Sequence, residues 1–281
     1  MQKSNILLNQ KPISKGEVFM KDVKPNRVLV AGGSGFIGQF LTKALLERSF
    51  RVRVFDVKAG GLNEIKNANL ELFIGDMLDD RAVNEAMEEI EVVYHLALAD
   101  SFEDFESLLT NLKGTCNLLE AALYNNVKHF LFASSRVVYW AEESTIGGRW
   151  YPLTKLATEK LCMKCYHEYG LPVTALRLGA VYFDVGWFCE SIASKALRGE
   201  KIVVKENEWC DYIHVDDVVN AFLTATLNEK TYGKVFDITN PNTTITELEL
   251  AEIIIKALKS KSKIEVAKEK PHKKAEKLLK F

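Results

Sequence analysis

The stretch RVLVAGGSGFIGQFLTKALLE, residues 27–47, decides how the rest of this chain is expected to fold. It opens with a short β-branched apolar run, passes through a turn in which glycine recurs as GxxGxxG, and continues as an amphipathic pattern of helical period. Glycine has no Cβ, so such a turn can be tight and can bring a phosphate close to the backbone amides at a helix N-terminus. We therefore expect a strand, a phosphate-binding turn and a helix, with a diphosphate contacting Gly32, Gly35, Phe36, Ile37 and Gly38.

An acidic residue follows the next apolar run at the spacing that a dinucleotide requires. The β-branched run 51–56 ends in Asp56, 18 residues after Gly38, where a carboxylate takes the ribose hydroxyls of NAD. Asp56 would repel a 2′-phosphate, so the sequence favours NAD over NADP, although the nearby Lys58 weakens that preference. Asp76 and Met77 follow a third apolar run. Asp76 either reaches the adenine amino group or caps the next helix, and both interpretations stay open.

Short apolar runs and longer amphipathic runs alternate through the first two thirds of the chain, as in EVVYHLA, FESLLTNLKGTCNLLEAALYNN, HFLFASS and KLATEKLCMKCYHEYG. This alternation predicts a parallel sheet with helices on both faces, a doubly wound α/β fold of the Rossmann type. After about residue 180 the alternation loosens, which predicts a smaller C-terminal substrate-binding lobe. In it, Thr244 or Thr246 is expected to cap a helix at 247–260. We expect an N-terminal arm at 1–26, a NAD-binding domain at 27–179 and 211–240, and the lobe at 180–210 and 241–281.

The bulk composition excludes several classes of partner. Lys plus Arg total 37 against 38 for Asp plus Glu, so the chain lacks the positive charge with which proteins bind nucleic acid or anionic membranes. No apolar run approaches the roughly 20 residues that span a bilayer, and the polar start has no signal-peptide core. The five scattered cysteines indicate a reducing compartment, so we expect a cytoplasmic protein that acts on small molecules. Cys162 and Cys165 form a lone CxxC in a helical pattern, which favours reduced core thiols over a metal site.

A tyrosine and a lysine four residues apart open the helical stretch WYPLTKLATEK, residues 150–160. Residues at that spacing share one helix face, so Tyr151 and Lys155 are expected to point together into the cleft at the carboxyl edge of the sheet. A tyrosine has a pKa of about 10, and about 4 kcal/mol of preferential stabilisation of the phenolate would bring it near neutrality. The Lys155 ammonium, beside an oxidised nicotinamide, is expected to supply most of it and make Tyr151 a usable acid or base. The strand HFLFASS delivers Ser135 to the same edge, where it would bond the reacting oxygen.

Further motifs resemble those of the extended short-chain dehydrogenase/reductases, in particular the NAD-dependent epimerase/dehydratase branch with its UDP-glucose 4-epimerase-like enzymes. They are GGSGFIG, GDMLD, VYHLALA, ASSRVVY, YPLTK, LRLGAVY and DYIHVDDVV. The resemblance implies Tyr151 as the acid/base, Lys155 as the anchor of the nicotinamide ribose, and Ser135 as the group that polarises the substrate oxygen. It also implies cofactor contacts at Leu96, Ala97, Ala99, Asn111, Leu178 and Gly179, and substrate contacts at Ser135, Arg136 and Tyr182.

The chain departs from that family at positions that contact substrate. Sugar-nucleotide members carry an asparagine and an arginine that grip the substrate phosphates, whereas this chain has Ala180 and Cys210, and Arg136 is one candidate replacement. Dehydratases carry Asp-Glu after the catalytic serine or threonine, whereas this chain has Arg136 and Val137, which argues against dehydration. A glycine of the family pattern is replaced by Trp140.

Three functions fit these residues. The first is a NAD-dependent sugar or nucleotide-sugar epimerase or dehydrogenase, in which a hydride leaves a hydroxyl-bearing carbon while Tyr151 takes the proton. The second is an NAD(P)H-dependent reductase of a non-sugar carbonyl, which Asp56 disfavours. The third is a catalytically silent NAD-binding regulatory protein, which the intact Ser135, Tyr151 and Lys155 argue against. The resemblance also implies a homodimer that forms through the helices at 105–123 and 152–170.

Overall fold

The computed structural model of the protein describes residues 25–99, 104–141, 150–183, 187–205, 209–240 and 244–267. Its larger part contains β1 (Arg27–Ala31), α1 (Phe36–Glu47), β2 (Arg51–Asp56), β3 (Leu70–Ile74), α2 (Asp80–Met87), β4 (Val92–His95), α3 (Phe105–Tyr124), β5 (His129–Ser135), α5 (Trp150–Tyr169), β6 (Val173–Leu178), α7 (Val215–Ala225) and β10 (Lys234–Ile238). Its smaller part contains β7 (Ala180–Tyr182), α6 (Trp187–Arg198), β8 (Ile202–Lys205), β9 (Trp209–His214), β11 (Thr244–Thr246), α8 (Glu247–Leu258) and β12 (Ile264–Ala267). The described residues also form the short 3-10 helices η1 (Gly60–Glu64), η2 (Arg136–Trp140) and η3 (Glu229–Thr231).

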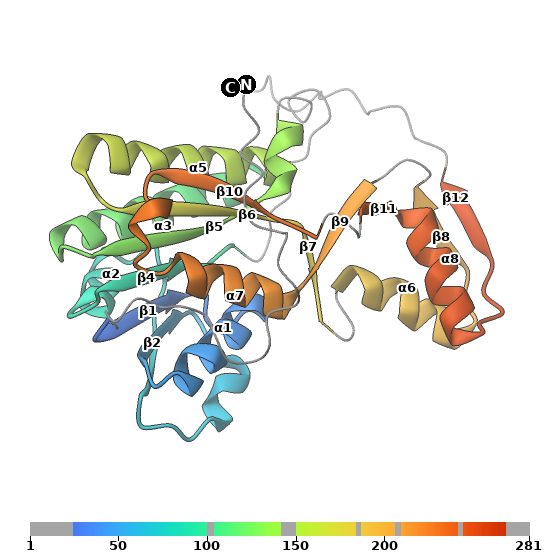
Figure 1. Ribbon diagram of the computed structural model, residues 1–281, viewed down its shortest axis with the longest axis horizontal. Helices are drawn as coiled ribbons and strands as arrows, with labels where there is room; N and C mark the ends of the chain where they lie inside the picture. Colours follow the sequence, from blue (N-terminus) through green and yellow to red (C-terminus); the bar gives the residue numbers. More distant parts are fainter. Residues whose placement is uncertain are drawn as a thin grey trace.

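Seven parallel strands form the main sheet in the order β10-β6-β5-β4-β1-β2-β3 (Figure 1). The register pairs Ala31 of β1 with Phe55 of β2 and with His95 of β4, so the carboxyl ends of the strands meet at one edge. The strand order reverses between β1 and β4, and ligands of doubly wound sheets bind at such a switch point. The predicted doubly wound α/β fold is confirmed.

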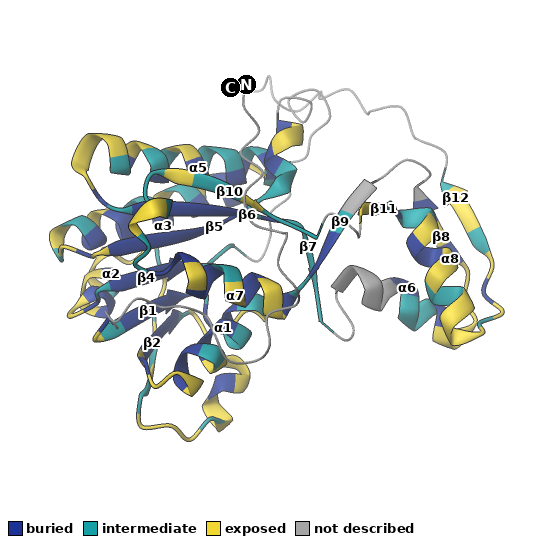
Figure 2. Cartoon of the chain, in the orientation of Figure 1, coloured by how far each residue is buried: buried dark blue, intermediate teal, exposed yellow. Residues whose placement is uncertain are grey.

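Helices cover both faces of this sheet because neighbouring residues of a strand point to opposite sides. On one face Val30 belongs to a core cluster with Leu41 of α1 and Phe222 of α7. On the other face Leu29 belongs to a cluster with Leu118 of α3 and Cys162 of α5. The central strands are accordingly buried along most of their length, while exposed residues lie on the helices, the turns and the edge strands (Figure 2).

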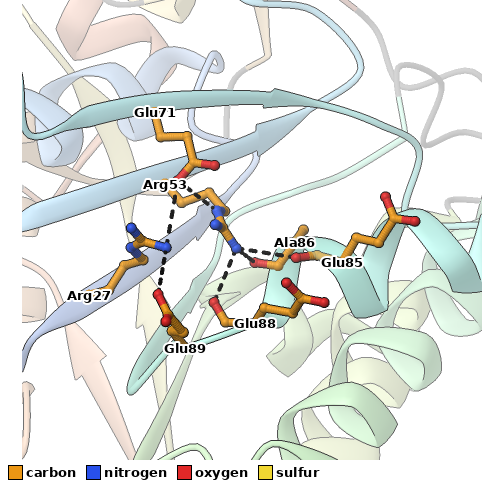
Figure 3. Close-up of polar contacts among 7 residues, drawn as sticks. All are labelled: Arg27, Arg53, Glu71, Glu85, Ala86, Glu88 and Glu89. Atoms are coloured by element: carbon orange, nitrogen blue, oxygen red, sulfur yellow. Dashed lines mark hydrogen bonds and ion pairs between the residues drawn. The ribbon is translucent and has the colours of Figure 1, made fainter.

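A buried arginine ties α2 to the sheet at the edge away from the strands' carboxyl ends (Figure 3). Arg53 of β2 places its Nε 2.9 Å from Glu71 Oε2 of β3. The neighbouring Arg27 pairs with Glu89 at 3.1 Å. The Arg53 Nη1 donates to three carbonyl oxygens at the end of α2, those of Glu85 (3.2 Å), Ala86 (2.9 Å) and Glu88 (3.1 Å). These bonds satisfy carbonyl groups that a helix end leaves without intrahelical partners.

Strands β7 and β9 carry the chain from the main sheet into a smaller lobe, on the right of Figure 1. There β9 lies between β7 and β11, and β8 pairs with β12. Ile192, Ile202 and Leu250 form part of a separate core between α6, α8 and β8. Thr246 caps α8 through a capping box with Glu249, so the alternative cap at Thr244 is wrong. The predicted domain boundary at residue 211 falls within β9, and most of the predicted arm at 1–26 lies outside the described residues.

Candidate active site

A cavity of about 590 Å³ opens at the carboxyl edge of the main sheet, walled by the glycine turn, the ends of β4, β5 and β6, and parts of η2, α5, β7 and β9. It brings together these residues singled out by the sequence: Gly32, Gly35, Phe36, Ile37, Gly38, Leu96, Ser135, Arg136, Tyr151, Lys155, Leu178 and Gly179. The other residues singled out lie outside its wall: Asp56, Asp76, Met77, Ala97, Ala99, Asn111 and Tyr182.

The glycine turn packs so closely that side chains would not fit. Gly32 has φ +81°, and a Cβ there would lie 2.4 Å from the backbone nitrogen of Ala97. A Cβ on Gly38 would lie 2.3 Å from the Gly32 carbonyl oxygen. Gly35 is the N-cap of α1 and no side chain caps the helix, so the N–H groups of the first turn can receive an anion. This cradle fits the diphosphate of a dinucleotide.

Asp56 ends β2 beside this turn. Its Oδ2 accepts a hydrogen bond from the Ser34 N–H at 3.0 Å, and the Ser34 hydroxyl donates to the Lys58 carbonyl at 2.5 Å. These bonds hold the carboxylate next to the cradle, where the ribose would follow the diphosphate. The position fits a ribose with free hydroxyls and opposes one that carries a 2′-phosphate.

Asp76 and Met77 lie between β3 and α2. The Asp76 Oδ1 accepts the Leu78 N–H at 2.9 Å, whereas the N-cap of α2 is Asp79. The interpretation of Asp76 as a helix cap is therefore wrong, and its contact with adenine stays a prediction. Met77 packs against α3, where a Cβ on Gly114 would lie 2.4 Å from the Met77 Cγ.

Asn111 is buried in α3 and supports the loop that follows β4. Its Nδ2 donates to the Ser107 carbonyl at 2.6 Å, and its Oδ1 accepts the Ala99 N–H at 3.0 Å. The same loop carries Ala97, whose backbone covers Gly32. Asn111 and Ala99 thus shape the edge of the glycine turn through the backbone.

Ser135, Tyr151 and Lys155 meet in the cavity wall. Tyr151 and Lys155 project from the first turns of α5, and a hydrogen bond joins the side chains of Tyr151 and Ser135. The Lys155 Nζ donates to the Ala133 carbonyl at 2.9 Å and lies 5.9 Å from the centre of the Tyr151 ring. A phenol, a hydroxyl and a buried ammonium therefore surround one point at which a substrate oxygen can exchange a proton.

Burial shifts the pKa values of Tyr151 and Lys155. Burial raises the pKa of Tyr151, and the hydrogen bond from Ser135 offsets only part of that rise. Burial also lowers the pKa of Lys155 to about 8. Among the protein's own residues, desolvation disfavours the phenolate more than its surroundings stabilise it. The predicted lowering of the tyrosine pKa concerned Lys155 together with an oxidised nicotinamide, and it stays a prediction.

A buried ion pair joins α5 to β6 next to the cavity wall. Glu159, one turn after Lys155 on α5, accepts two hydrogen bonds from Arg177 of β6, at 2.6 and 2.8 Å. It also accepts the Ser134 hydroxyl at 2.7 Å. The pKa of Arg177 is raised, chiefly by its hydrogen bonding to Glu159. The pair fixes β5, β6 and α5 relative to one another.

Arg136 follows Ser135 directly and reaches Asp211 on β9. Its Nη1 forms an ion pair with the Asp211 Oδ2, and the Thr244 hydroxyl donates to the other carboxylate oxygen. The Arg136 side chain is 31% exposed, while its Nε is buried without a hydrogen-bond partner among the described residues. The sequence did not single out Asp211, although it stands in the quoted motif DYIHVDDVV.

Aromatic residues line or adjoin the cavity at the side of the lobe. Tyr139 and Trp140 of η2 belong to its wall. Tyr139 was not predicted as a site residue, although it ends the motif ASSRVVY. Tyr139 donates to both carboxylate oxygens of Asp237, at 3.0 and 2.8 Å. Tyr182 instead packs edge-on against His214, with 5.3 Å between ring centres, so its contact with substrate stays a prediction.

Two kinds of feature are absent from the part of the chain that the structure describes. Its His, Cys, Asp and Glu side chains form no group of three that could hold a metal ion. None of its helices combines the length and hydropathy needed to cross a bilayer. Cys162 and Cys165 are free thiols buried in α5.

The chain is similar to known proteins along most of its length. The profile of the NAD dependent epimerase/dehydratase family matches residues 28–239. Identity is 29% over 242 residues with UDP-N-acetyl-alpha-D-glucosaminuronate decarboxylase of Bacillus cytotoxicus, covering 75% of this chain and 74% of that protein. It is 27% over 279 residues with UDP-glucuronic acid decarboxylase 4 of Arabidopsis thaliana, covering 88% of this chain. A structure of UDP-glucose 4-epimerase with UDP-glucose from Thermotoga maritima has a TM-score of 0.72 at 26% identity, covering 86% of each chain. This chain spans 61% of the Arabidopsis enzyme and 52% of another curated relative.

Proposed function

The chain belongs to the NAD-dependent epimerase/dehydratase family, an enzyme family of the extended short-chain dehydrogenase/reductase type with NAD as its cofactor, and we propose that it epimerises a nucleotide sugar. The proposed reaction oxidises a hydroxyl-bearing ring carbon and then reduces the ketone on its other face. The observation that carries the proposal is the meeting of Ser135, Tyr151 and Lys155 in one cavity with the glycine cradle. Two relatives and one structural neighbour are UDP-sugar enzymes by name, which supports a nucleotide sugar as substrate.

The residues present fit the cofactor. Bound NAD supplies a nicotinamide ring that exchanges a hydride with the substrate carbon. Gly32, Gly35 and Gly38 would hold its diphosphate, and Asp56 its adenosine ribose. Lys155 would hold the ribose at the nicotinamide end, because its ammonium lies in the cavity wall beside Tyr151.

Tyr151 is the proposed acid/base. Because burial raises its pKa, the phenol keeps its proton at neutral pH and can donate it to a carbonyl oxygen. The reverse step needs the phenolate, and the nearby Lys155 ammonium stabilises that charge. Ser135, which is hydrogen-bonded to Tyr151, is placed to orient the same substrate oxygen.

The cavity favours hydride exchange over elimination. Loss of water from a keto sugar requires a second acid/base beside Tyr151. Val137 stands two residues after Ser135, and Asp211 is the only carboxylate in the described wall, where it is paired with Arg136. Epimerisation needs no further proton-transfer group, so it fits the wall better than dehydration does.

The test measures turnover of the full chain with NAD on UDP-glucose, UDP-galactose and UDP-glucuronate, with products separated by chromatography. Tyr151→Phe is expected to lower kcat by about 100-fold or more, because it removes the exchangeable proton. Tyr169→Phe is the matched control, since Tyr169 ends the same helix and is 69% exposed. A Tyr151→Phe protein that binds NAD and turns over as fast as the control would exclude Tyr151 as the acid/base. An unchanged chain that binds NAD and turns over none of the three substrates would refute the proposed function.

We further infer that two copies associate through α3 and α5. These helices pack side by side on one face of the sheet, and Phe105 and Leu109 are 45% and 44% exposed on α3. Burying such side chains favours association. Light scattering should give a dimer mass for the unchanged chain and for Leu197→Glu, which alters an exposed leucine of the lobe, but a monomer mass for Leu109→Glu. A monomer mass for the unchanged chain contradicts this inference.

A further inference from the structure

We propose that Arg136 binds an acidic group on the sugar ring, so that the substrate is a nucleotide hexuronic acid and not a neutral nucleotide sugar. This deepens the proposed function and rests on it, because the function places the oxidised carbon at Tyr151 and Ser135.

Arg136 lies in the part of the wall that would face the reacting carbon. It is the residue after Ser135, and both line the cavity together with Tyr151. The group nearest to it would be the substituent on the ring carbon beside the one that is oxidised. For oxidation at C4 of a hexuronic acid, that substituent is the carboxylate on C5. The diphosphate is attached to C1 on the opposite side of the ring, so the guanidinium lies nearer to the ring acid than to the phosphates.

Arg136 is the cation that the cavity offers to a substrate. Lys155 and Arg136 are the two basic residues in the described part of its wall. The Lys155 ammonium donates to the Ala133 carbonyl and lies beside Tyr151, where the chemistry needs it. Arg136, although paired with Asp211, is therefore the basic residue of this described wall that can meet an anionic group of the substrate.

The protein uses only part of the Arg136 guanidinium. Arginine has five N–H donors in a planar fork that matches a carboxylate. Among the described residues the ion pair to Asp211 engages Nη1, and the side chain remains 31% exposed. Asp211 is in turn held by the Thr244 hydroxyl. The aspartate thus fixes the guanidinium at the wall and leaves donors for a second carboxylate.

Arg136 could alternatively be only a link between η2 and β9, and that role makes a different prediction. A structural link stabilises the cavity wall whichever sugar is bound. Its removal therefore weakens the binding of acidic and neutral substrates equally. If Arg136 binds the acidic group, its removal weakens the binding of the acidic substrate alone. UDP-glucuronate and UDP-glucose differ only in the carboxylate against CH₂OH at C5, so their ratio of dissociation constants isolates the effect.

The experiment measures the Kd of both nucleotides for the full chain loaded with NAD, by calorimetry. The unchanged chain should bind UDP-glucuronate about 10- to 100-fold more tightly, as expected for hydrogen bonds to a charged group. Arg136→Gln should bring the ratio near one. Arg198→Gln should leave it unchanged, because Arg198 is an exposed residue paired with Glu200 in the lobe. Asp211→Asn should raise the ratio, since it removes the negative charge that shares the guanidinium.

Equal weakening of both nucleotides by Arg136→Gln, or no preference for the acid in the unchanged chain, would overturn the proposal. NAD binding and thermal melting show whether each variant is folded. If Arg136→Gln does not fold, the preference of the unchanged chain for UDP-glucuronate over UDP-glucose tests the proposal. Failure of the proposed function looks different. In that case no nucleotide sugar is turned over, whatever the ratio of dissociation constants.

Discussion

Replacing Glu159 with glutamine should destabilise the protein far more than the same change elsewhere on α5. Glu159 is 1% exposed and accepts Arg177 Nη2 at 2.6 Å, Arg177 Nε at 2.8 Å and the Ser134 hydroxyl at 2.7 Å. Glutamine keeps the size of the side chain. It removes the charge and turns one of the two acceptor atoms into a donor.

The loss in the free energy of unfolding depends on the charge of Arg177, which stays in the interior. The Arg177 side chain is only 18% exposed, so without Glu159 its charge stays largely desolvated and unpaired. Breaking a buried ion pair costs about 3–5 kcal/mol, and the remaining amide oxygen recovers about 1 kcal/mol, so we expect a loss of about 2–4 kcal/mol. The matched control is Glu168→Gln, whose side chain is 51% exposed and pairs with Lys164 at 2.7 Å. Exposed pairs of this spacing contribute about 0.3–0.5 kcal/mol.

The assay is urea unfolding of the full chain at pH 7 and 25 °C, monitored by circular dichroism. Equal slopes of the unfolding free energy against urea concentration would confirm that the variants expose the same surface on unfolding. A difference of less than about 1 kcal/mol between the two variants would refute the argument that the pair is buried and coupled. The double variant Glu159→Gln with Arg177→Met should recover part of the loss, because no unpaired charge remains in the interior.

Three further predictions follow from local geometry. Gly170→Ala and Gly32→Ala both place a side chain at positive φ (+72° and +81°), but a Cβ at residue 170 meets nothing within 4 Å. Gly170→Ala should therefore lose only about 1 kcal/mol of unfolding free energy in urea. Gly32→Ala should in addition lose NAD binding, measured by fluorescence titration. Burial lowers the pKa values of His95 and His129 to about 3. Between pH 3 and about 6.5 the unfolded chain therefore binds more protons than the folded protein, so the free energy of unfolding should fall by about 2 kcal/mol from pH 7 to 5.5. An unfolding free energy that does not change over this pH range would contradict the prediction. Thr246→Ala removes the capping box of α8 and should cost about 1 kcal/mol, seen as faster hydrogen exchange in that helix and not in α3.

The parts of the site that could be predicted from sequence are those fixed by local backbone geometry. A turn that admits no Cβ requires glycine at Gly32 and Gly38, so the pattern alone locates β1, the turn and α1. The spacing of Tyr151 and Lys155 likewise fixes a shared helix face whatever packs against it. Both requirements hold within a few residues, and a single sequence displays them.

The parts that could not be predicted depend on residues far apart in the chain. Arg136 pairs with Asp211 because β9 returns to the cavity edge beside β7, and no spacing in the sequence announces that return. The choice between Thr244 and Thr246 depends on where β11 ends, since either residue has an acidic side chain at a suitable distance. The pKa of Tyr151 depends on its burial by the rest of the fold, which composition and spacing do not report.

On helix α5, local sequence spacing and long-range contacts predict different partners for the same charged residues. Lys155 and Glu159 are four residues apart, a spacing at which opposite charges on one helix normally pair. Glu159 is instead saturated by Arg177 and Ser134, and Lys155 donates to the Ala133 carbonyl. Arg177 thereby engages the Glu159 carboxylate, and among the described residues no hydrogen bond or ion pair joins that carboxylate to the Lys155 ammonium. In the proposed function, the buried arginine on β6 therefore contributes to the proton chemistry of the cavity by keeping Glu159 from pairing with Lys155, as well as by joining β6 to α5.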